Sequence, residues 1–358
     1  MKNLPVIVVT ISLLLISMLV TAGAGAVAPV PADQPLQIVT RGPVGDAPQK
    51  VWTAEEMENA IPYPLPQVAM PLKDGAPVEP DGPLTMSPGS AGMVGAPTGA
   101  EADALAELGA VEMGGASPTG YSYPPPYTRF GVPWNYQVYP FRTLGKVFFT
   151  SGGYNYVCSG SVGYNRMIWT AGHCAYDNYY GTWHTNWVFV PAYRNGAAPY
   201  GQWTQYDAAV LTAYSAGNNN SIAYDYAAVI VNDRYGRSIG STVGYLGYMA
   251  NASRTLHWMD FGYPAASPFA GQYLHLNAAS HARDDGNFSP NPIGIGTDMT
   301  GGCSGGPWIY KFDQYAGAYN YVNGVNSYKY INPNQPYQIY SSYFGSGAVT
   351  IFDWGNDF

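Results

Sequence analysis

The chain has 358 residues and a formal net charge of -8, and only 11% of its residues are charged. This composition provides no basic patch, which argues against a nucleic-acid partner. The 32 tyrosines and 43 glycines indicate many short strands and turns with polar-tipped aromatic surfaces.

The N-terminus has the pattern of an export signal. A short basic segment, Met1 to Asn3, precedes an almost wholly apolar run from Leu4 to Val20, and residues 22–26 twice have the small-x-small form that a signal peptidase cleaves. We predict a signal peptide over 1–26, with an uncleaved N-terminal anchor as the alternative because the apolar run is slightly long. No other long apolar stretch follows, so we expect a secreted protein that has left the membrane.

A segment with little apolar periodicity follows over residues 27–138. Prolines and glycines recur in it, and only two stretches are helix-like, Thr53 to Ala60 and Gly99 to Met113. The first has the form of a capping box, with Thr53 three residues before Glu56. Segments of this kind are usually linkers or pro-regions. We expect a poorly structured pro-region, because a hydrolytic motif lies downstream in an exported chain.

Short strands dominate the remaining domain, residues 139–358. β-branched and aromatic residues alternate with turn formers, and we find no convincing long helix. This pattern predicts an all-β fold, either an antiparallel sandwich or a pair of barrels. Strands are predicted at 144–150, 156–162, 167–170, 183–190, 203–213, 223–231, 255–261, 307–310 and 321–327.

Two motifs in this domain carry the groups that acyl transfer by a serine requires. Thr-Ala-Gly-His173-Cys174 supplies a base, and Gly-Gly-Cys303-Ser304-Gly-Gly-Pro supplies a hydroxyl on a glycine-rich turn. Such a reaction needs a base, a nucleophile and free backbone N–H groups. Either motif alone could be an ordinary turn, but the pair predicts a serine hydrolase.

Two cysteines lie where they can brace the histidine motif. Cys158 precedes Cys174 by the length of a strand, a turn and a second strand, which predicts that the two lie on neighbouring strands. In an oxidising compartment we expect a disulfide that closes a loop of about 15 residues and stabilises the fold by roughly 3 kcal/mol.

On these motifs the chain, from about Arg142 to Phe358, resembles the trypsin-like, chymotrypsin-fold serine peptidases, in the exported bacterial branch that includes glutamyl endopeptidases. The resemblance implies two six-stranded antiparallel β-barrels with the active site in the cleft between them. It implies Ser304 as the nucleophile, His173 as the general base, and the N–H groups of Gly302 and Ser304 as the oxyanion hole.

Two aspartates are candidates for the carboxylate that orients the imidazole. Asp225 directly precedes an apolar strand and matches the family's pattern of aspartate followed by alanine and β-branched residues. Asp207 has similar neighbours but lies closer to His173 in the sequence, which leaves less chain for the intervening strands. We therefore favour Asp225.

The residue before the nucleophile departs from the pattern of trypsin-type enzymes that are activated by a new N-terminus. Those enzymes carry an aspartate there, whereas this chain has Cys303. A neutral thiol cannot form the activating ion pair, so removal of a blocking pro-segment is the expected route of activation. We interpret Cys303 as a small buried apolar residue rather than a reactive thiol.

The residues that would bind the substrate side chain indicate two opposite substrate preferences. Asp298 matches the family's position at the base of the specificity pocket, where a carboxylate would select lysine or arginine. Ser327 and Lys329 lie on the expected pocket wall, and Lys329 could neutralise Asp298 or receive an acidic side chain. Asn326 stands where glutamyl enzymes use a histidine, which argues against an acidic preference.

The distribution of acidic residues bears on the same question. No glutamate follows Glu112, although eleven aspartates fall between Asp177 and Asp357. An enzyme that cuts after glutamate would profit from this, and Glu112 would then be a candidate maturation site; compositional bias is the alternative.

We expect no metal or other cofactor. The spacing of His184, His257, His275 and His281 does not indicate a metal site, and Asp284-Asp285-Gly286-Asn287 is better explained as a polar turn than as a calcium site. The predicted function is a monomeric secreted endopeptidase that acts on proteins or peptides. The alternative is a catalytically silent relative that binds peptides or cell-wall material.

Overall fold

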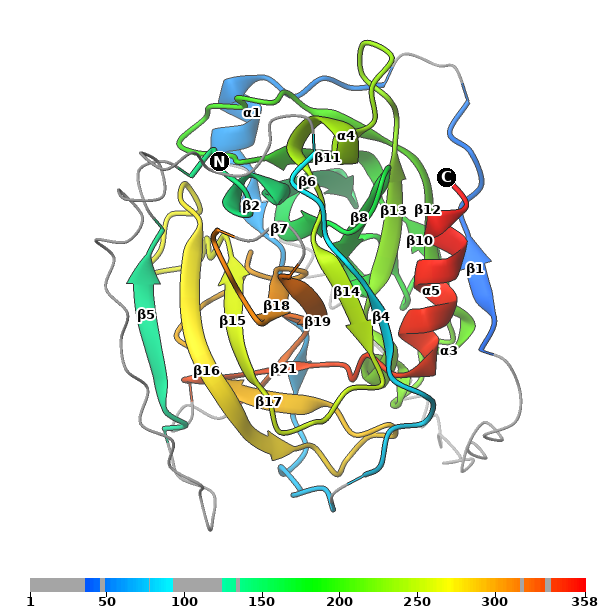
Figure 1. The fold of residues 1–358 in the computed structure, drawn as a ribbon, viewed down its shortest axis with the longest axis vertical. Helices are drawn as coiled ribbons and strands as arrows, with labels where there is room; N and C mark the ends of the chain where they lie inside the picture. Colours follow the sequence, from blue (N-terminus) through cyan, green and yellow to red (C-terminus); the bar gives the residue numbers. More distant parts are fainter. Residues whose placement is uncertain are drawn as a thin grey trace, which may run out of the picture. The chain divides into compact units, whose positions relative to one another are not determined.

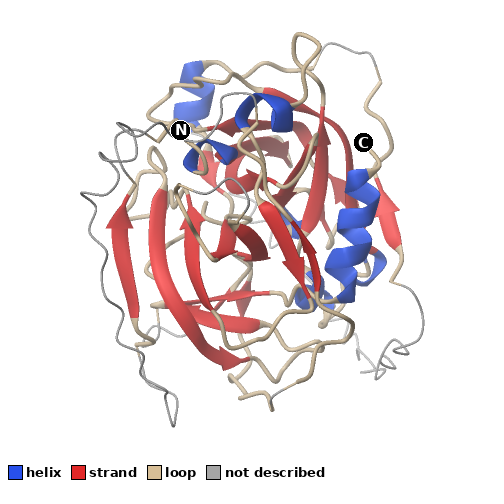
Figure 2. Cartoon of the chain, viewed as in Figure 1, coloured by secondary structure: helices blue, strands red, loops and turns tan. Residues whose placement is uncertain are grey.

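The computed structural model describes residues 36–45, 49–76, 78–92, 124–132, 136–315, 319–331 and 336–358. Strands make up most of the regular structure (Figure 2), which confirms the predicted all-β class. The predicted signal peptide and the helix-like stretch at 99–113 lie outside the described residues. Within the ranges given above, no helix is both long enough and apolar enough to cross a membrane.

The first barrel is a closed ring of six antiparallel strands (Figure 1). The strand order is β12-β11-β6-β7-β8-β13, and pairing between β12 and β13 closes the ring. Branched and aromatic side chains such as Val147, Phe149 and Ile168 fill the interior. The strands are β6 (Leu144–Ser151), β7 (Tyr154–Val162), β8 (Met167–Thr170), β11 (Thr185–Pro191), β12 (Trp203–Leu211) and β13 (Ala227–Val231).

The second barrel follows the path β19-β18-β15-β16-β17-β21, again with antiparallel neighbours. The amide of Ser327, just after β19, donates to the carbonyl of Tyr340 in β21 (3.0 Å), which brings the two ends of the path together. A further strand, β14 (Gly247–Ala250), pairs with β19 in parallel. The six strands are β15 (His257–Gly262), β16 (His275–Asp284), β17 (Ile293–Gly296), β18 (Pro307–Tyr310), β19 (Tyr321–Val325) and β21 (Gln338–Ser341).

The C-terminal helix α5 (Ser346–Asn356) is a feature that the sequence analysis missed. It packs on β12 and β13 of the first barrel and on β14, and Figure 1 shows it beside these strands. Ile351 is buried, and the ring of Phe352 stacks on Tyr248 with 4.3 Å between centroids.

Other short elements connect the strands of this domain. They are α3 (Thr212–Ser215), α4 (Ile239–Val243), β9 (Tyr176–Asp177), β10 (Thr182–Trp183) and the 3-10 turns η1 (Phe141–Thr143), η2 (Gly172–Cys174) and η3 (Ser221–Tyr224).

The described parts of residues 27–138 differ from the expectation of a poorly structured segment. Their one helix, α1 (Ala54–Asn59), begins with the predicted capping box of Thr53 and Glu56. Their strands add to the barrels: β1 pairs with β12, β2 with β7, β4 with β14 and β5 with β16, while β3 pairs with β20 (Lys329–Tyr330). An extended segment needs no core of its own where a sheet edge supplies its hydrogen bonds. The strands are β1 (Ile38–Thr40), β2 (Ile61–Pro62), β3 (Gln67–Val68), β4 (Thr85–Ser87) and β5 (Tyr127–Gly131).

Candidate active site

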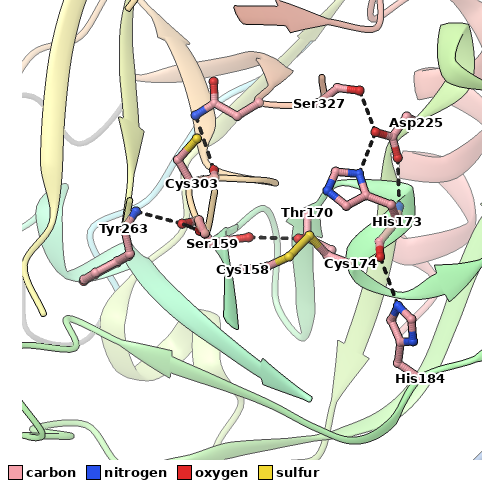
Figure 3. Close-up of a disulfide and its surroundings, with 12 residues drawn as sticks. Cys158, Ser159, Thr170, His173, Cys174, His184, Asp225, Tyr263, Cys303 and Ser327 are labelled. Atoms are coloured by element: carbon pink, nitrogen blue, oxygen red, sulfur yellow. Dashed lines mark hydrogen bonds and ion pairs between the residues drawn. A yellow bond between two sulfur atoms is a disulfide. The ribbon is translucent and has the colours of Figure 1, made fainter. Parts of the chain in front are cut away.

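The predicted disulfide joins Cys158 to Cys174. Cys158 lies on β7 as expected, whereas Cys174 lies in η2, the turn directly after β8, and not on a strand. The bond therefore ties the turn that carries His173 to the neighbouring strand (Figure 3). The His173 ring lies close to these two sulfurs, but a disulfide leaves no thiolate to bind a metal.

His173 and Asp225 form a buried pair. Nδ1 of His173 is 2.7 Å from Oδ2 of Asp225, and the His173 amide donates to Oδ1 (2.8 Å). The two residues meet because β8, which precedes His173, pairs with β13, which follows Asp225. The carboxylate thereby fixes Nδ1 as the protonated nitrogen, which leaves Nε2 as a proton acceptor.

The second barrel supports this carboxylate. Ser327 donates its hydroxyl to Oδ2 of Asp225 (2.5 Å), as Figure 3 shows, and the Asp225 amide donates to Oγ of Ser342 (2.9 Å). Burial by itself would raise the pKa of Asp225, but its interaction with His173 and the hydrogen bonds from His173 and Ser327 hold the pKa below its usual value. The side chain is thus set up as an anion behind the imidazole.

Asp207, the other candidate, lies on β12 and accepts a hydrogen bond from the neighbouring amide of Ala208 (2.7 Å). No contact with His173 is among its interactions in the part of the chain that the structure describes. The structure brings only Asp225 to the imidazole.

The loop that carries Ser304 requires its glycines. Gly302 and Gly305 have φ values of +97° and +79°, which L side chains rarely adopt, and a Cβ at Gly305 would lie 2.1 Å from Oγ1 of Thr170. Among the described residues, the backbone amides of Gly302 and Ser304 have no hydrogen-bond acceptor. They are therefore available to an incoming oxyanion.

Ser159, on β7, connects the serine loop to the histidine turn. Its amide donates to the carbonyl of Ser304 (2.7 Å) and its hydroxyl to the carbonyl of Gly302 (2.9 Å), while its own carbonyl accepts from Oγ1 of Thr170 (2.8 Å). Figure 3 shows the contact with Thr170. Ser159 was not predicted as a site residue, although it directly follows Cys158.

Two reactive atoms remain without a partner in the described structure. Oγ of Ser304 and Nε2 of His173 are both buried and neither makes a hydrogen bond there. The structure thus does not contain the predicted contact between the imidazole and the hydroxyl as a formed hydrogen bond. Such bonds often form only in the complex with substrate.

Cys303 is completely buried and unpaired, and burial raises the pKa of its thiol well above the ordinary value. It packs with Met299 and Trp308 in the core of the second barrel. Its environment is that of an inert apolar side chain.

The predicted specificity residues Asp298 and Lys329 line one cavity, together with Thr300 and Gly301. Asp298 already forms an ion pair with Arg129 of β5 (2.8 Å). Lys329 donates from Nζ to the carbonyls of Met299 (2.5 Å) and Pro336 (3.1 Å). Ser327 contacts Asp225 instead.

The N-terminal segment also lines this cavity, through residues 62–65 and Gln67. This contribution was not predicted, although the alternating prolines at 62, 64 and 66 mark a stretch that favours an extended chain.

Comparison with known proteins gives consistent results. A glutamyl endopeptidase of Bacillus licheniformis is 30% identical over 144 residues, which are 39% of this chain and 42% of that protein. The structure of the protease Anisep from Arthrobacter nicotinovorans has 38% identity and a TM-score of 0.54, covering 61% of this chain and 96% of that one. The thermostable serine protease AL20 from an extremophilic microorganism has 32% identity and a TM-score of 0.54, covering 60% and 97%.

The family model described as trypsin matches residues 135–345, which is more than half of the chain and includes both motifs. The fold, the glycine-rich serine loop and the buried histidine–aspartate pair agree with this match. The chain belongs to the trypsin family.

Proposed function

We propose that this protein is a serine endopeptidase with Ser304 as nucleophile, His173 as general base and Asp225 as the orienting carboxylate. The observation that carries the proposal is the buried pair of His173 and Asp225, connected through Ser159 to the serine loop. Among the described residues, the amides of Gly302 and Ser304 in that loop have no hydrogen-bond acceptor. The names of the similar proteins, all peptidases, support the same class of reaction.

The geometry suits a two-step acyl transfer. Nε2 of His173 takes the proton of Ser304 as Oγ attacks the substrate carbonyl, and the N–H groups of Gly302 and Ser304 hold the resulting oxyanion. Asp225 stabilises the imidazolium. The imidazolium then protonates the leaving amine, and a water molecule, deprotonated in turn by His173, hydrolyses the acyl-enzyme.

Two charged residues of the cavity favour different substrates. Asp298 would select a lysine or arginine side chain. In the intact chain, however, its carboxylate already forms an ion pair with Arg129. Lys329 would attract an acidic side chain and, once Arg129 is gone, would offset the charge of Asp298. The preference of the enzyme therefore depends on the balance between these two residues.

We further propose that the chain is made as a secreted proenzyme that acts as a monomer on proteins or peptides. Residues 1–26 would be the signal peptide, 27–138 the pro-region and 139–358 the mature enzyme. The apolar N-terminus and a disulfide, which persists in oxidising compartments, support export. The silent-relative alternative is disfavoured, because a decayed site has no physical reason to keep the histidine, aspartate and serine together.

The test is Ser304→Ala, with Ser253→Ala, an exposed serine outside the site, as the matched control. The full chain is produced in an exporting bacterial host and allowed to mature. Casein hydrolysis by the secreted protein should fall by about 10⁶-fold in Ser304→Ala, and labelling by a fluorophosphonate should disappear, with circular dichroism unchanged. Unchanged hydrolysis in Ser304→Ala would refute the proposal.

A further inference from the structure

We propose that residues 61–68, the strap, are a built-in inhibitor that occupies the substrate site of the intact chain. This inference rests on the proposed peptidase function and adds how that activity is restrained. The strap belongs to the predicted pro-region and crosses the site from β7 of the first barrel to β20 beside the second.

Tyr63 covers the catalytic imidazole. Its ring lies nearly parallel to that of His173, with 5.9 Å between centroids and 16° between planes. Its amide donates to the carbonyl of Val157 (3.0 Å), and its ring meets those of Tyr156 and Phe149 edge-on. A substrate that approaches His173 must displace this ring.

Leu65 fills apolar space next to the nucleophile. It is only 7% exposed and belongs to the buried cluster that includes Met299 and Cys303, the latter adjacent to Ser304. It also lines the cavity that contains Asp298 and Lys329. An apolar side chain of the strap thus lines the same cavity as the groups that would select a substrate.

The strap also uses the backbone edge that a peptide would need. β3 pairs in parallel with β20, so that the amide of Lys329 donates to the carbonyl of Pro66 (3.0 Å) and that of Ile331 to the carbonyl of Val68 (3.0 Å). Extended peptides are commonly bound by adding a strand to such an edge. While the strap is in place, these donors are not available.

The sequence of the strap, Ile-Pro-Tyr-Pro-Leu-Pro-Gln-Val, suits an inhibitor better than a substrate. Alternating prolines hold the chain extended before it binds, which lowers the entropic cost of occupying the site. Within the described structure, no strap carbonyl is hydrogen-bonded to the amides of Gly302 or Ser304. The strap thus covers the site without a carbonyl hydrogen-bonded in the predicted oxyanion hole.

Both ends of the strap are anchored. Before it, Trp52 is buried and donates from Nε1 to the carbonyl of Asn186 (2.9 Å), and Met57 of α1 packs in the core. After it, Asp74 pairs with Arg283, and the amide of Gly75 donates to the carbonyl of Asp284 (2.9 Å). These anchors keep the strap at a high effective concentration, so that even weak contacts keep the site occupied.

The experiment compares labelling of the intact chain by a fluorophosphonate in the wild type and in the double variant Tyr63→Ala/Leu65→Ala. Gel separation distinguishes the intact band from the processed band at early times. The double variant should label about ten-fold faster or more in the intact band, because removing both side chains opens the site. The control is Ile38→Ala/Val39→Ala, which shortens two side chains of β1, a strand outside the strap. This variant should label at the wild-type rate.

Equal labelling of the intact and processed wild-type bands would overturn the strap proposal, as would a double variant no faster than the wild type. If neither band labels or hydrolyses casein in any variant, the proposed function fails instead.

A second experiment does not depend on the folding of the double variant. A synthetic peptide of residues 61–68 is added to the processed enzyme. It should inhibit competitively, and its Tyr63→Ala/Leu65→Ala form should inhibit at least about ten-fold less well; equal potency of the two peptides would contradict the assignment of these side chains.

Discussion

The His173–Asp225 pair and the cavity lined by Asp298 and Lys329 are built from different parts of the chain. His173 and Asp225 take their supporting hydrogen bonds from Ser327 and Ser342, all within residues 139–358. The cavity, in contrast, is lined partly by residues 62–65 and Gln67, and its carboxylate, Asp298, is paired with Arg129. These lining residues and Arg129 belong to the predicted pro-region. Under the proposed function, the hydrogen bonds that orient the imidazole do not depend on the N-terminal segment, whereas removal of that segment changes the shape and the charge of the recognition site.

The largest expected effect comes from removing the carboxylate of Asp225. Asp225→Asn keeps the shape but cannot hold the imidazole with Nε2 as the acceptor, so kcat of the processed enzyme should fall by about 10⁴-fold. Asp207→Asn is the matched control, because that buried carboxyl interacts with Ala208, Gly42 and Arg41 and not with the imidazole. A larger loss of kcat in Asp207→Asn than in Asp225→Asn would contradict the assignment.

The structure around His173 was easier to predict from the sequence than the cavity, because its contacts join residues that local motifs mark. The strand at Met167–Thr170 matches its prediction, and the disulfide beside it is present, because their signals are local. Asp225 follows from the same kind of signal, an aspartate before an apolar strand.

Other elements owe their structure to distant partners, so no local pattern could reveal them. Helix α5 contains Gly347, Val349, Thr350 and Gly355, which are poor helix formers, and it is stabilised by packing Ile351 and Phe352 on the first barrel. Strand β16 is rich in small and polar residues and is held by pairing on both edges with β15, β17 and β5. The strap likewise lacks a core and is ordered by edges far away in the sequence.

The charge balance of the cavity provides a second, smaller test. Asp298→Asn should remove one of the two carboxylates that interact with Lys329. In the processed enzyme this should raise the ratio of kcat/KM for a peptide cut after glutamate to that for one cut after lysine by about ten-fold. Lys329→Met should lower the same ratio by a similar factor, because Asp298 is then the remaining charge. If both variants shift the ratio in the same direction, the two residues do not act on a common substrate side chain.

Acid should lower the stability of the first barrel near His173, because it protonates the buried His184. His184 is 2% exposed, stacks on Phe149 and hydrogen-bonds from its Nε2 to the carbonyl of His173 (3.0 Å). Burial lowers the pKa of His184 to about 4, below its ordinary value of 6.5. Since the unfolded chain binds a proton first, the stability that neutral His184 provides is complete above about pH 6.5 and is lost as the pH falls towards 4.

The variant His184→Phe keeps an aromatic ring against Phe149 but has no group to protonate. In urea unfolding of the Ser304→Ala protein, used to avoid self-digestion, the parent should lose at most about 3 kcal/mol more than His184→Phe between pH 7 and pH 4. An equal loss in both proteins would mean that other groups cause the acid sensitivity. If the parent instead gains stability relative to the variant as the pH falls, His184 is protonated in the folded protein. It would then place a positive charge beside the turn that carries His173.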